Sequence, residues 1–364
     1  MTADPFRDRR TVAGLAREIA TVARRLPRPV TLMEVCGTHT HAIAEAGLRR
    51  LMPPNVRLVS GPGCPVCVTP VSWLDRALAL GRERGTVLAT FGDLVRVPSS
   101  TGTLEELRAH GGHVEIVYSP RDAVEFAAAH PEARVVFLAV GFETTAPPIA
   151  AALAEAEARG ISNFLLLPGN KTMPGPLAAL ADAVDGFLMP GHVSVITGAE
   201  AWRFLPERHG VSAAVAGFTP ADVLAAILAL LRRIARGEPG LDNLYGRVVT
   251  PGGNREAQAL LARTFEPTDA EWRGLGVLPG SGLGLREGLA HRDASRIPVD
   301  LPEPREPAGC RCGDVLRGEI DPPGCPLFAG ACTPERPVGA CMVSSEGACA
   351  AWYRHERWAR EATE

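Results

Sequence analysis

The nine cysteines of this 364-residue chain are concentrated near its two ends. Three lie within the first 67 residues, and then none occurs before residue 310. Four thiolates are the ligand set of a [4Fe–4S] cluster or of an all-cysteine zinc site. The C-terminal segment holds more than enough thiols for such a centre: Cys310, Cys312, Cys325, Cys332, Cys341 and Cys349.

The spacing of these tail cysteines favours an iron–sulfur cluster. Structural zinc sites more often use tight CxxC pairs, and no pair in the tail has that spacing. The loops between the thiols are rich in Gly and Pro and long enough to wrap around a cuboidal cluster. A spacing of C-x14-C-x6-C-x16-C is formed by Cys310, Cys325, Cys332 and Cys349. We take these four as the predicted ligands, and zinc as the alternative metal.

The segment GPGCPVCVTP contains a CxxC pair, Cys64 and Cys67, in a loop stiffened by three prolines. Such a pair can cycle between dithiol and disulfide, or it can donate two thiolates to a metal. Spacing alone does not separate a redox role from a metal-binding role.

The segment MEVCGTHTH places Cys36 at a predicted strand-to-helix turn. The N–H groups at a helix N-terminus favour a thiolate, so we expect a lowered pKa for this thiol. His39 and His41 follow closely enough to act as ligands, bases or hydrogen-bond partners.

Weaker signals lie in other loops that follow predicted strands. Asp93 in FGDLVR, Glu143 in GFETT and His192 in PGHVS are candidate polar site residues, although each could equally be a turn or capping residue. A serine triad is not supported, because no GxSxG motif surrounds Ser194. No GxxxxGK[ST] phosphate loop is present.

The elements that must position these residues alternate between short apolar strands and amphipathic helices up to about residue 245. This alternation predicts parallel sheets built from βαβ units. The predicted buried strands lie at 30–35, 56–60, 86–90, 114–118, 134–140, 163–167 and 186–190. The segment YSPRDAVEF near residue 120 is expected to separate two such sheets. Four strands run directly into polar, Gly-containing loops, the usual position of reactive groups in such sheets. We expect a first α/β domain over 1–120, a second over 121–245, and a loop-rich domain carrying the tail cysteines over 246–364.

Composition indicates an ordinary globular protein, with 46% hydrophobic residues, 22% charged residues and a net charge of −3. No basic surface for nucleic acid is expected. The start MTADPFRDRR lacks the apolar core of a secretion signal. The longest helical apolar run has nine residues, against about 20 needed to cross a bilayer. A cytoplasmic location is therefore expected, where cysteines serve metal or redox chemistry more often than disulfide staples.

Taken together, five motifs resemble the HypD family of hydrogenase maturation factors. They are CGTH, GPGCPVC, GFETT, PGHVS and the tail pattern CGDVLRG…CPLF…GACMVSSEGACAA. Two small departures are Leu94, where the family pattern suggests methionine, and Gly191 before His192. Neither departure removes a thiol.

The resemblance implies two α/β domains and a third domain with a [4Fe–4S] cluster. It also implies a scaffold for the Fe(CN)2CO unit of [NiFe]-hydrogenases. Its partners would be a HypC-type chaperone, a HypE-type cyanide donor and, through the chaperone, the hydrogenase large subunit. Two alternative functions remain: a free-standing iron–sulfur oxidoreductase acting on a small molecule, and a zinc protein whose CxxC pair is structural.

Carried onto this sequence, the resemblance makes Cys36 the iron-binding thiolate. Cys64 and Cys67 become a redox-active pair or additional iron ligands. The polar residues nearest these motifs would orient thiolates or move protons: His41, Asp93 and Glu143.

Overall fold

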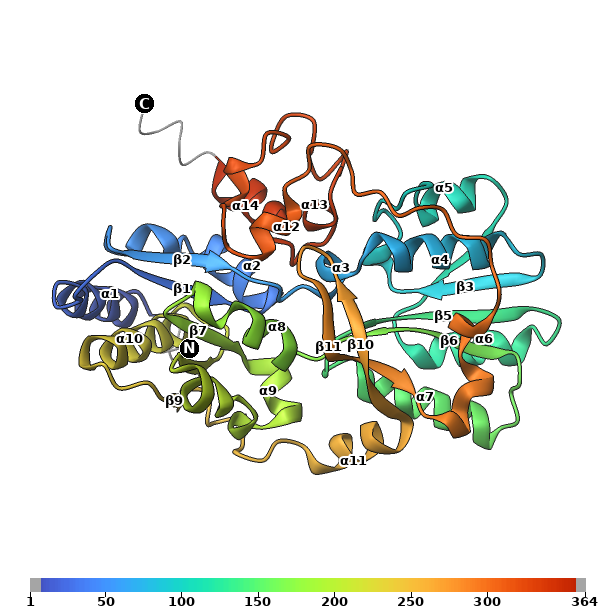
Figure 1. Cartoon of the computed structure of the whole chain (residues 1–364), viewed down its shortest axis with the longest axis horizontal. Helices are drawn as coiled ribbons and strands as arrows, with labels where there is room; N and C mark the ends of the chain where they lie inside the picture. Colours follow the sequence, from blue (N-terminus) through green and yellow to red (C-terminus); the bar gives the residue numbers. More distant parts are fainter. Residues whose placement is uncertain (1–7, 358–364) are drawn as a thin grey trace.

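The computed structural model describes residues 8–357 and contains two parallel sheets flanked by helices (Figure 1). The first sheet has the strand order β2 (Val56–Ser60), β1 (Val30–Glu34), β7 (Gly186–Pro190), β8 (Ser212–Ala216), β9 (Leu241–Asn243). The second has the order β4 (His113–Ile116), β3 (Thr86–Thr90), β5 (Arg134–Gly141), β6 (Phe164–Asn170). The predicted α/β class with doubly wound parallel sheets is confirmed.

Central strands such as β3, β7 and β8 are buried along their whole length, because helices cover both faces of each sheet. The helices that precede β7 in the chain are α1 (Arg9–Ala23), α2 (Gly37–Glu45), α3 (Pro65–Val68), α4 (Val71–Arg82), α5 (Leu104–Ala109), α6 (Pro120–Ala129), α7 (Ala146–Ala158) and α8 (Pro174–Leu180). The later helices are α9 (Gly191–Thr197), α10 (Pro220–Arg236), α11 (Arg255–Thr264), α12 (Cys312–Leu316), α13 (Ala340–Val343) and α14 (Ala348–His355). No helix in residues 8–357 is long and apolar enough to cross a membrane.

The expectation that the sheets divide near residue 120 is wrong. Strands β4 and β5 lie on either side of that position and both belong to the second sheet. Ser119 and Asp122 form a capping box that begins α6, so YSPRDAVEF is a helix start and not a linker. The first sheet begins with β1 and β2 and is completed only by β7, β8 and β9, after the second sheet has been inserted.

The strand orders create a switch point in each sheet, where ligands usually bind at the carboxyl ends of the strands. In the first sheet the switch point lies between the adjacent strands β1 and β7. Cys36 lies in the short turn after β1, and His192 is the second residue of α9, which begins directly after β7. In the second sheet it lies between β3 and β5, whose following loops carry Asp93 and Glu143.

The C-terminal part packs onto these loops. An antiparallel hairpin, β10 (Phe265–Trp272) and β11 (Gly276–Leu285), leads into loops and short helices. Helix α13 packs against α3, and α14 packs against α2. Figure 1 shows α3 between the two sheets with α12, α13 and α14 on one side of it. The tail cysteines are therefore brought to the segments that carry Cys36, Cys64 and Cys67.

Candidate functional site

Two strand-end loops of the first sheet lie in direct backbone contact. Cys36 is the residue before α2, and the Gly37 N–H donates a hydrogen bond of 2.9 Å to the Gly63 carbonyl oxygen. A Cβ added at Gly63 would lie 2.2 Å from the Cys36 nitrogen. Only glycine allows this approach, which holds the Cys36 turn beside the CxxC loop.

The CxxC pair forms a disulfide. Cys64 and Cys67 are bonded to each other, with 5.2 Å between their Cα atoms. Cys64 precedes α3, and its sulfur also accepts a hydrogen bond of 3.2 Å from the Cys67 N–H. Both residues are buried. The structure therefore contains the oxidised, disulfide form of the pair, which is one of the two states of the predicted redox role.

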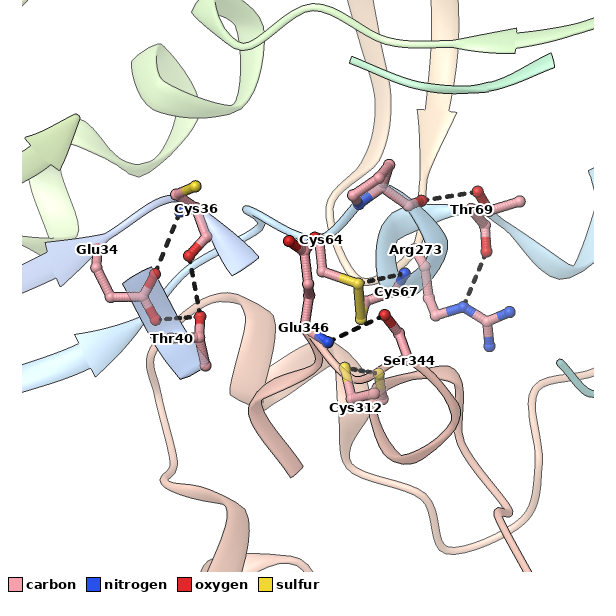
Figure 2. The surroundings of a disulfide bond; sticks show 12 residues. Glu34, Cys36, Thr40, Cys64, Cys67, Thr69, Arg273, Cys312, Ser344 and Glu346 are labelled. Carbon is pink, nitrogen blue, oxygen red and sulfur yellow. Dashed lines mark hydrogen bonds between the residues drawn. A yellow bond between two sulfur atoms is a disulfide. The ribbon is translucent and has the colours of Figure 1, made fainter. Parts of the chain in front are cut away.

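A buried carboxylate that the motif analysis missed supports the Cys36 turn (Figure 2). Glu34 accepts hydrogen bonds from the Thr40 hydroxyl at 2.6 Å and from the Cys36 N–H at 3.2 Å. Burial raises the pKa of Glu34 to about 7, although Thr40, Ser60 and Arg49 act in the opposite direction. The signal in the sequence was a single acidic residue at the end of a predicted buried strand.

The expectation of a lowered pKa for the Cys36 thiol is wrong. Burial raises the pKa of this thiol to about 12, and this exceeds the stabilisation from the His39 and Thr38 N–H groups. The charges of Glu346 and Glu34 raise it further. A thiol in this setting ionises when a cation or metal binds it, because metal binding displaces the proton.

Glu346, from the tail, is a second acidic residue that sequence motifs did not single out. Its Oε1 accepts a hydrogen bond of 2.9 Å from the Thr38 hydroxyl. A Cβ at Gly37 would lie 2.4 Å from Glu346 Cβ. Figure 2 shows Glu346 between Cys36 and the disulfide. The C-terminal segment thus supplies a carboxylate to the centre of the site.

The histidines near Cys36 have different surroundings. His39 is fully buried, and its Nε2 lies 2.9 Å from the Gly217 carbonyl oxygen in the loop after β8. Burial lowers the pKa of His39 to about 4, so it is neutral and structural. His41 contacts the His355 ring edge-on at 5.1 Å. His192 stacks on Phe218 at 4.0 Å, and its pKa is lowered by burial.

The two predicted polar residues of the second sheet do not contact the thiols. Asp93 is exposed, and Glu143 is buried with Oε1 accepting a hydrogen bond of 2.9 Å from the Met173 N–H. Within residues 8–357, neither side chain hydrogen-bonds to Cys36, Cys64 or Cys67. Both lie instead at the switch point of the second sheet, which α3 reaches by packing against β5.

The six tail cysteines line one cavity. The cavity volume is about 10 Å³, and Leu327, Phe328 and Met342 complete an apolar lining. The Cys312 and Cys341 sulfurs are 2.6 Å apart, and the Cys325 sulfur lies 4.0 Å from the Gly309 carbonyl oxygen. No three His, Cys, Asp or Glu side chains of the described chain form a ready site for a single metal ion.

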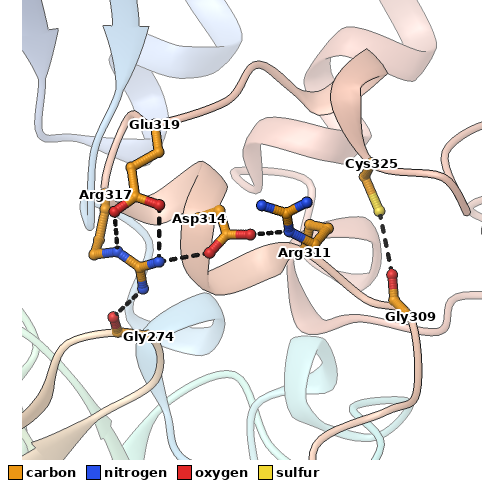
Figure 3. A network of polar contacts seen from close by, with 7 residues as sticks. All are labelled: Gly274, Gly309, Arg311, Asp314, Arg317, Glu319 and Cys325. Atoms are coloured by element: carbon orange, nitrogen blue, oxygen red, sulfur yellow. Dashed lines mark hydrogen bonds and ion pairs between the residues drawn. The ribbon is translucent and has the colours of Figure 1, made fainter.

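The cysteines nevertheless suit a [4Fe–4S] cluster. Such a cluster is held by four thiolates, one on each iron, so the four sulfurs need not converge on a single ion. Gly339 faces this cavity, because a Cβ there would lie 2.5 Å from the Cys310 sulfur. Arg317 fixes α12 by binding Asp314 and the Gly274 carbonyl oxygen (Figure 3). The cysteine-lined cavity is thereby attached to the β10–β11 hairpin.

Comparison with known proteins gives matches over nearly the whole chain. The HypD model, described as the Hydrogenase formation hypA family, matches residues 10–356. The chain is 43% identical to Hydrogenase maturation factor HypD of Azotobacter vinelandii, covering 97% of this chain and 96% of that protein. Identity is also 43% to Hydrogenase maturation factor HypD of Cupriavidus necator, with 98% and 97% covered. The factor of the same name from Rhizobium leguminosarum bv. viciae is 43% identical, with 98% and 95% covered.

Replacing Gly63 with alanine should push the Cys36 turn away from the CxxC loop, because backbone atoms surround the new Cβ. We expect a loss of about 1–3 kcal/mol in the free energy of unfolding, measured by denaturant titration. The matched control is Gly14→Ala in α1, where nothing lies within 4 Å of the new Cβ. Equal stability of the two variants would contradict the close contact.

Replacing Glu143 with glutamine should change the pH dependence of stability. Burial raises the pKa of Glu143 from 4.5 to about 7. Its protonated form therefore stabilises the fold below about pH 4.5, and this contribution is lost as the pH rises through 7. Relative to Glu143→Gln, the wild type should lose on the order of 3 kcal/mol between pH 4.5 and 8. If the difference in the free energy of unfolding between wild type and Glu143→Gln stays constant from pH 4.5 to 8, the carboxyl of Glu143 does not have a raised pKa.

Proposed function

The chain belongs to the HypD family of hydrogenase maturation factors, and from this membership we propose that it is an iron-binding, redox-active assembly scaffold. Its cargo is the Fe(CN)2CO unit of [NiFe]-hydrogenases. Cys36 binds the iron of this cargo, and the CxxC pair beside it supplies redox equivalents or further thiolates. The proposal accounts for two kinds of thiol site in one chain.

One observation carries the proposal: a buried thiol at a sheet switch point lies in a turn bonded to the loop of a buried disulfide. Low-spin iron with cyanide and carbonyl ligands is soft and suits thiolate ligation. The high pKa of free Cys36 fits a ligand that gives up its proton when the iron arrives.

Reducing the disulfide breaks the S–S bond and takes two electrons and two protons, which yields the thiols of Cys64 and Cys67. When bound, the proposed [4Fe–4S] cluster supplies electrons one at a time, and these originate from an external one-electron donor protein. The tail residues that would hold it are Cys310, Cys325, Cys332 and Cys349. Cys341 lies on α13, which packs against α3, and its sulfur is 2.6 Å from the Cys312 sulfur.

We further propose that the chain works in the cytoplasm with a HypC-type chaperone and a HypE-type cyanide donor. The chaperone would then carry the iron unit to the hydrogenase large subunit. The chain has no phosphate-loop motif, which fits activation of the cyanide precursor on a partner. A free-standing iron–sulfur oxidoreductase is the alternative function.

Infrared spectroscopy tests the assembly role. The full chain, purified anaerobically with its chaperone partner from cells that make hydrogenase, should show cyanide and carbonyl stretching bands. Cys36→Ala should remove these bands, because the iron loses its thiolate, and should leave the brown colour of the tail cluster. Bands that persist in Cys36→Ala would refute the assignment of this thiol. A brown wild-type complex without bands would favour the oxidoreductase.

Metal analysis tests the cluster separately. The anaerobic protein should be brown and carry about four irons and four sulfides per chain. Serine at any of the four predicted ligand positions should remove most of this iron. Cys64→Ser and Cys67→Ser are the matched controls, which should retain the cluster yet abolish hydrogenase maturation. A colourless, zinc-loaded protein would exclude the cluster.

A further inference from the structure

A cavity of about 320 Å³ lies between the start of α4, the end of β6 and the β10–β11 hairpin. This volume is in the range of pockets that bind small molecules. Its apolar walls include Trp73, Leu167 and Pro168, and the Trp73 indole N–H donates a hydrogen bond of 2.6 Å to the Pro168 carbonyl oxygen, which fixes the ring. None of the thiols lines this cavity. Four charged residues do: Arg76, Lys171, Asp269 and Glu271.

Lys171, the residue after β6, is held in place by two strands and is 5% exposed. Its backbone N–H donates to the Gly141 carbonyl oxygen at 2.9 Å, and a β-bridge joins it to Gly282 of β11. Its Nζ donates to the Glu271 carbonyl oxygen at 2.6 Å and lies 5.4 Å from the centre of the Trp272 ring. The Glu271 carboxylate acts on this amine through its charge, but within residues 8–357 the amine forms no ion pair.

The chemistry of this position differs from that of every other basic side chain in the protein. Lys171 is the only lysine among the 38 Lys and Arg residues of the chain. A guanidinium stays protonated, whereas a buried amine can lose its proton and act as a nucleophile. Burial lowers the pKa of Lys171 to about 8, although the charge of Glu271 acts in the opposite direction. On the order of a tenth of the amine is therefore neutral at pH 7.

Arg76 brings a cation to the same cavity from α4. Its guanidinium donates at 3.1 Å to one backbone carbonyl oxygen and forms no ion pair in the described part of the chain. A guanidinium binds a carboxylate through two parallel N–H bonds. The two acids of the cavity are exposed and already accept hydrogen bonds, Asp269 from the Gly280 N–H at 3.0 Å and Glu271 from the Ser72 hydroxyl at 2.5 Å. The cavity therefore offers an amine for a carbonyl carbon and a guanidinium for a carboxylate.

We propose that this cavity binds a small 2-oxo acid, whose carbonyl carbon is attacked by the Lys171 amine while Arg76 holds its carboxylate. The attack forms a C–N bond, and one proton moves from the nitrogen to the carbonyl oxygen to give a carbinolamine. Breaking the C–O bond then releases this oxygen as water and leaves an imine between Lys171 and the substrate. No electrons are exchanged with an external reagent. The inference does not depend on iron assembly, because no thiol takes part.

The single lysine makes the test specific. The full-length protein is incubated anaerobically with pyruvate and cyanoborohydride, which delivers hydride to an imine and fixes it as a secondary amine. Peptide mass spectrometry then measures the adduct at Lys171 and at the α-amino group of the chain, the two aliphatic amines that can react. The adduct at Lys171 should saturate as the pyruvate concentration rises, because a bound complex precedes the reaction. The adduct at the α-amino group should rise in proportion to concentration.

Three variants separate the amine, the carboxylate contact and the general charge of α4. Lys171→Arg should lose the adduct at this position and keep the one at the α-amino group. Arg76→Met should slow labelling of Lys171 by pyruvate by about tenfold or more, because the charge-assisted pair with the carboxylate is lost. Acetone has no carboxylate, so it should label wild type and Arg76→Met equally. Arg82→Met is the matched control, because Arg82 lies on the same helix, donates to Thr101 and does not line the cavity.

The proposal is overturned if pyruvate leaves Lys171 of the folded protein unlabelled. It is also overturned if labelling rises in proportion to concentration, or if Arg76→Met and Arg82→Met are labelled equally fast. Arg76 is partly exposed, so its replacement is expected to leave the fold intact and this comparison can decide. Far-ultraviolet circular dichroism of each variant confirms that the fold is retained.

Discussion

The site depends on the backbone contact between the loops that follow β1 and β2. The hydrogen bond from the Gly37 N–H to the Gly63 carbonyl oxygen joins two loops that neighbouring parallel strands already bring to one edge. Since Gly63 has no side chain, the chain can place the Cys36 turn directly against it. Each further group of the site, from Glu346 to the hairpin, packs onto this joined pair of loops.

Burial sets the electrostatics around this contact. Glu34, Cys36 and His39 are all buried, and burial shifts the pKa of each toward its neutral form. Removing charged groups from water is costly, so an interior of this kind stays neutral until a cation enters. Under the proposed function, the iron of the cargo would supply that cation. Ionisation of Cys36 is therefore expected only when a cation binds beside it.

The strands were largely predictable because their apolar runs are short, buried and bounded by turns. Those predicted at 56–60, 86–90 and 186–190 match β2, β3 and β7 residue for residue. Strand β8 was missed, since its sequence SAAVA has small side chains and little of the β-branched signal. Which strands share a sheet was not predictable in this way. The pairing of β1 with β7 joins Leu32 to Gly186, and local pattern holds no information about so distant a partner.

The thiols were likewise found from their motifs, but the residues that control them were not. Glu34 and Glu346 belong to no cysteine spacing, and their places at the site follow from burial and from contacts between distant segments. Arg49 shows the same coupling, because it pairs with Glu356 of the tail at 2.6 Å and donates to Ser60 of β2 at 3.1 Å. An undocked tail would leave Arg49 and Thr38 without these carboxylates, and a buried charge without its partner is strongly destabilising. Docking of the tail therefore gives Thr38 and Arg49 their carboxylate partners, and it brings the tail thiols beside the segments that carry Cys36 and the disulfide.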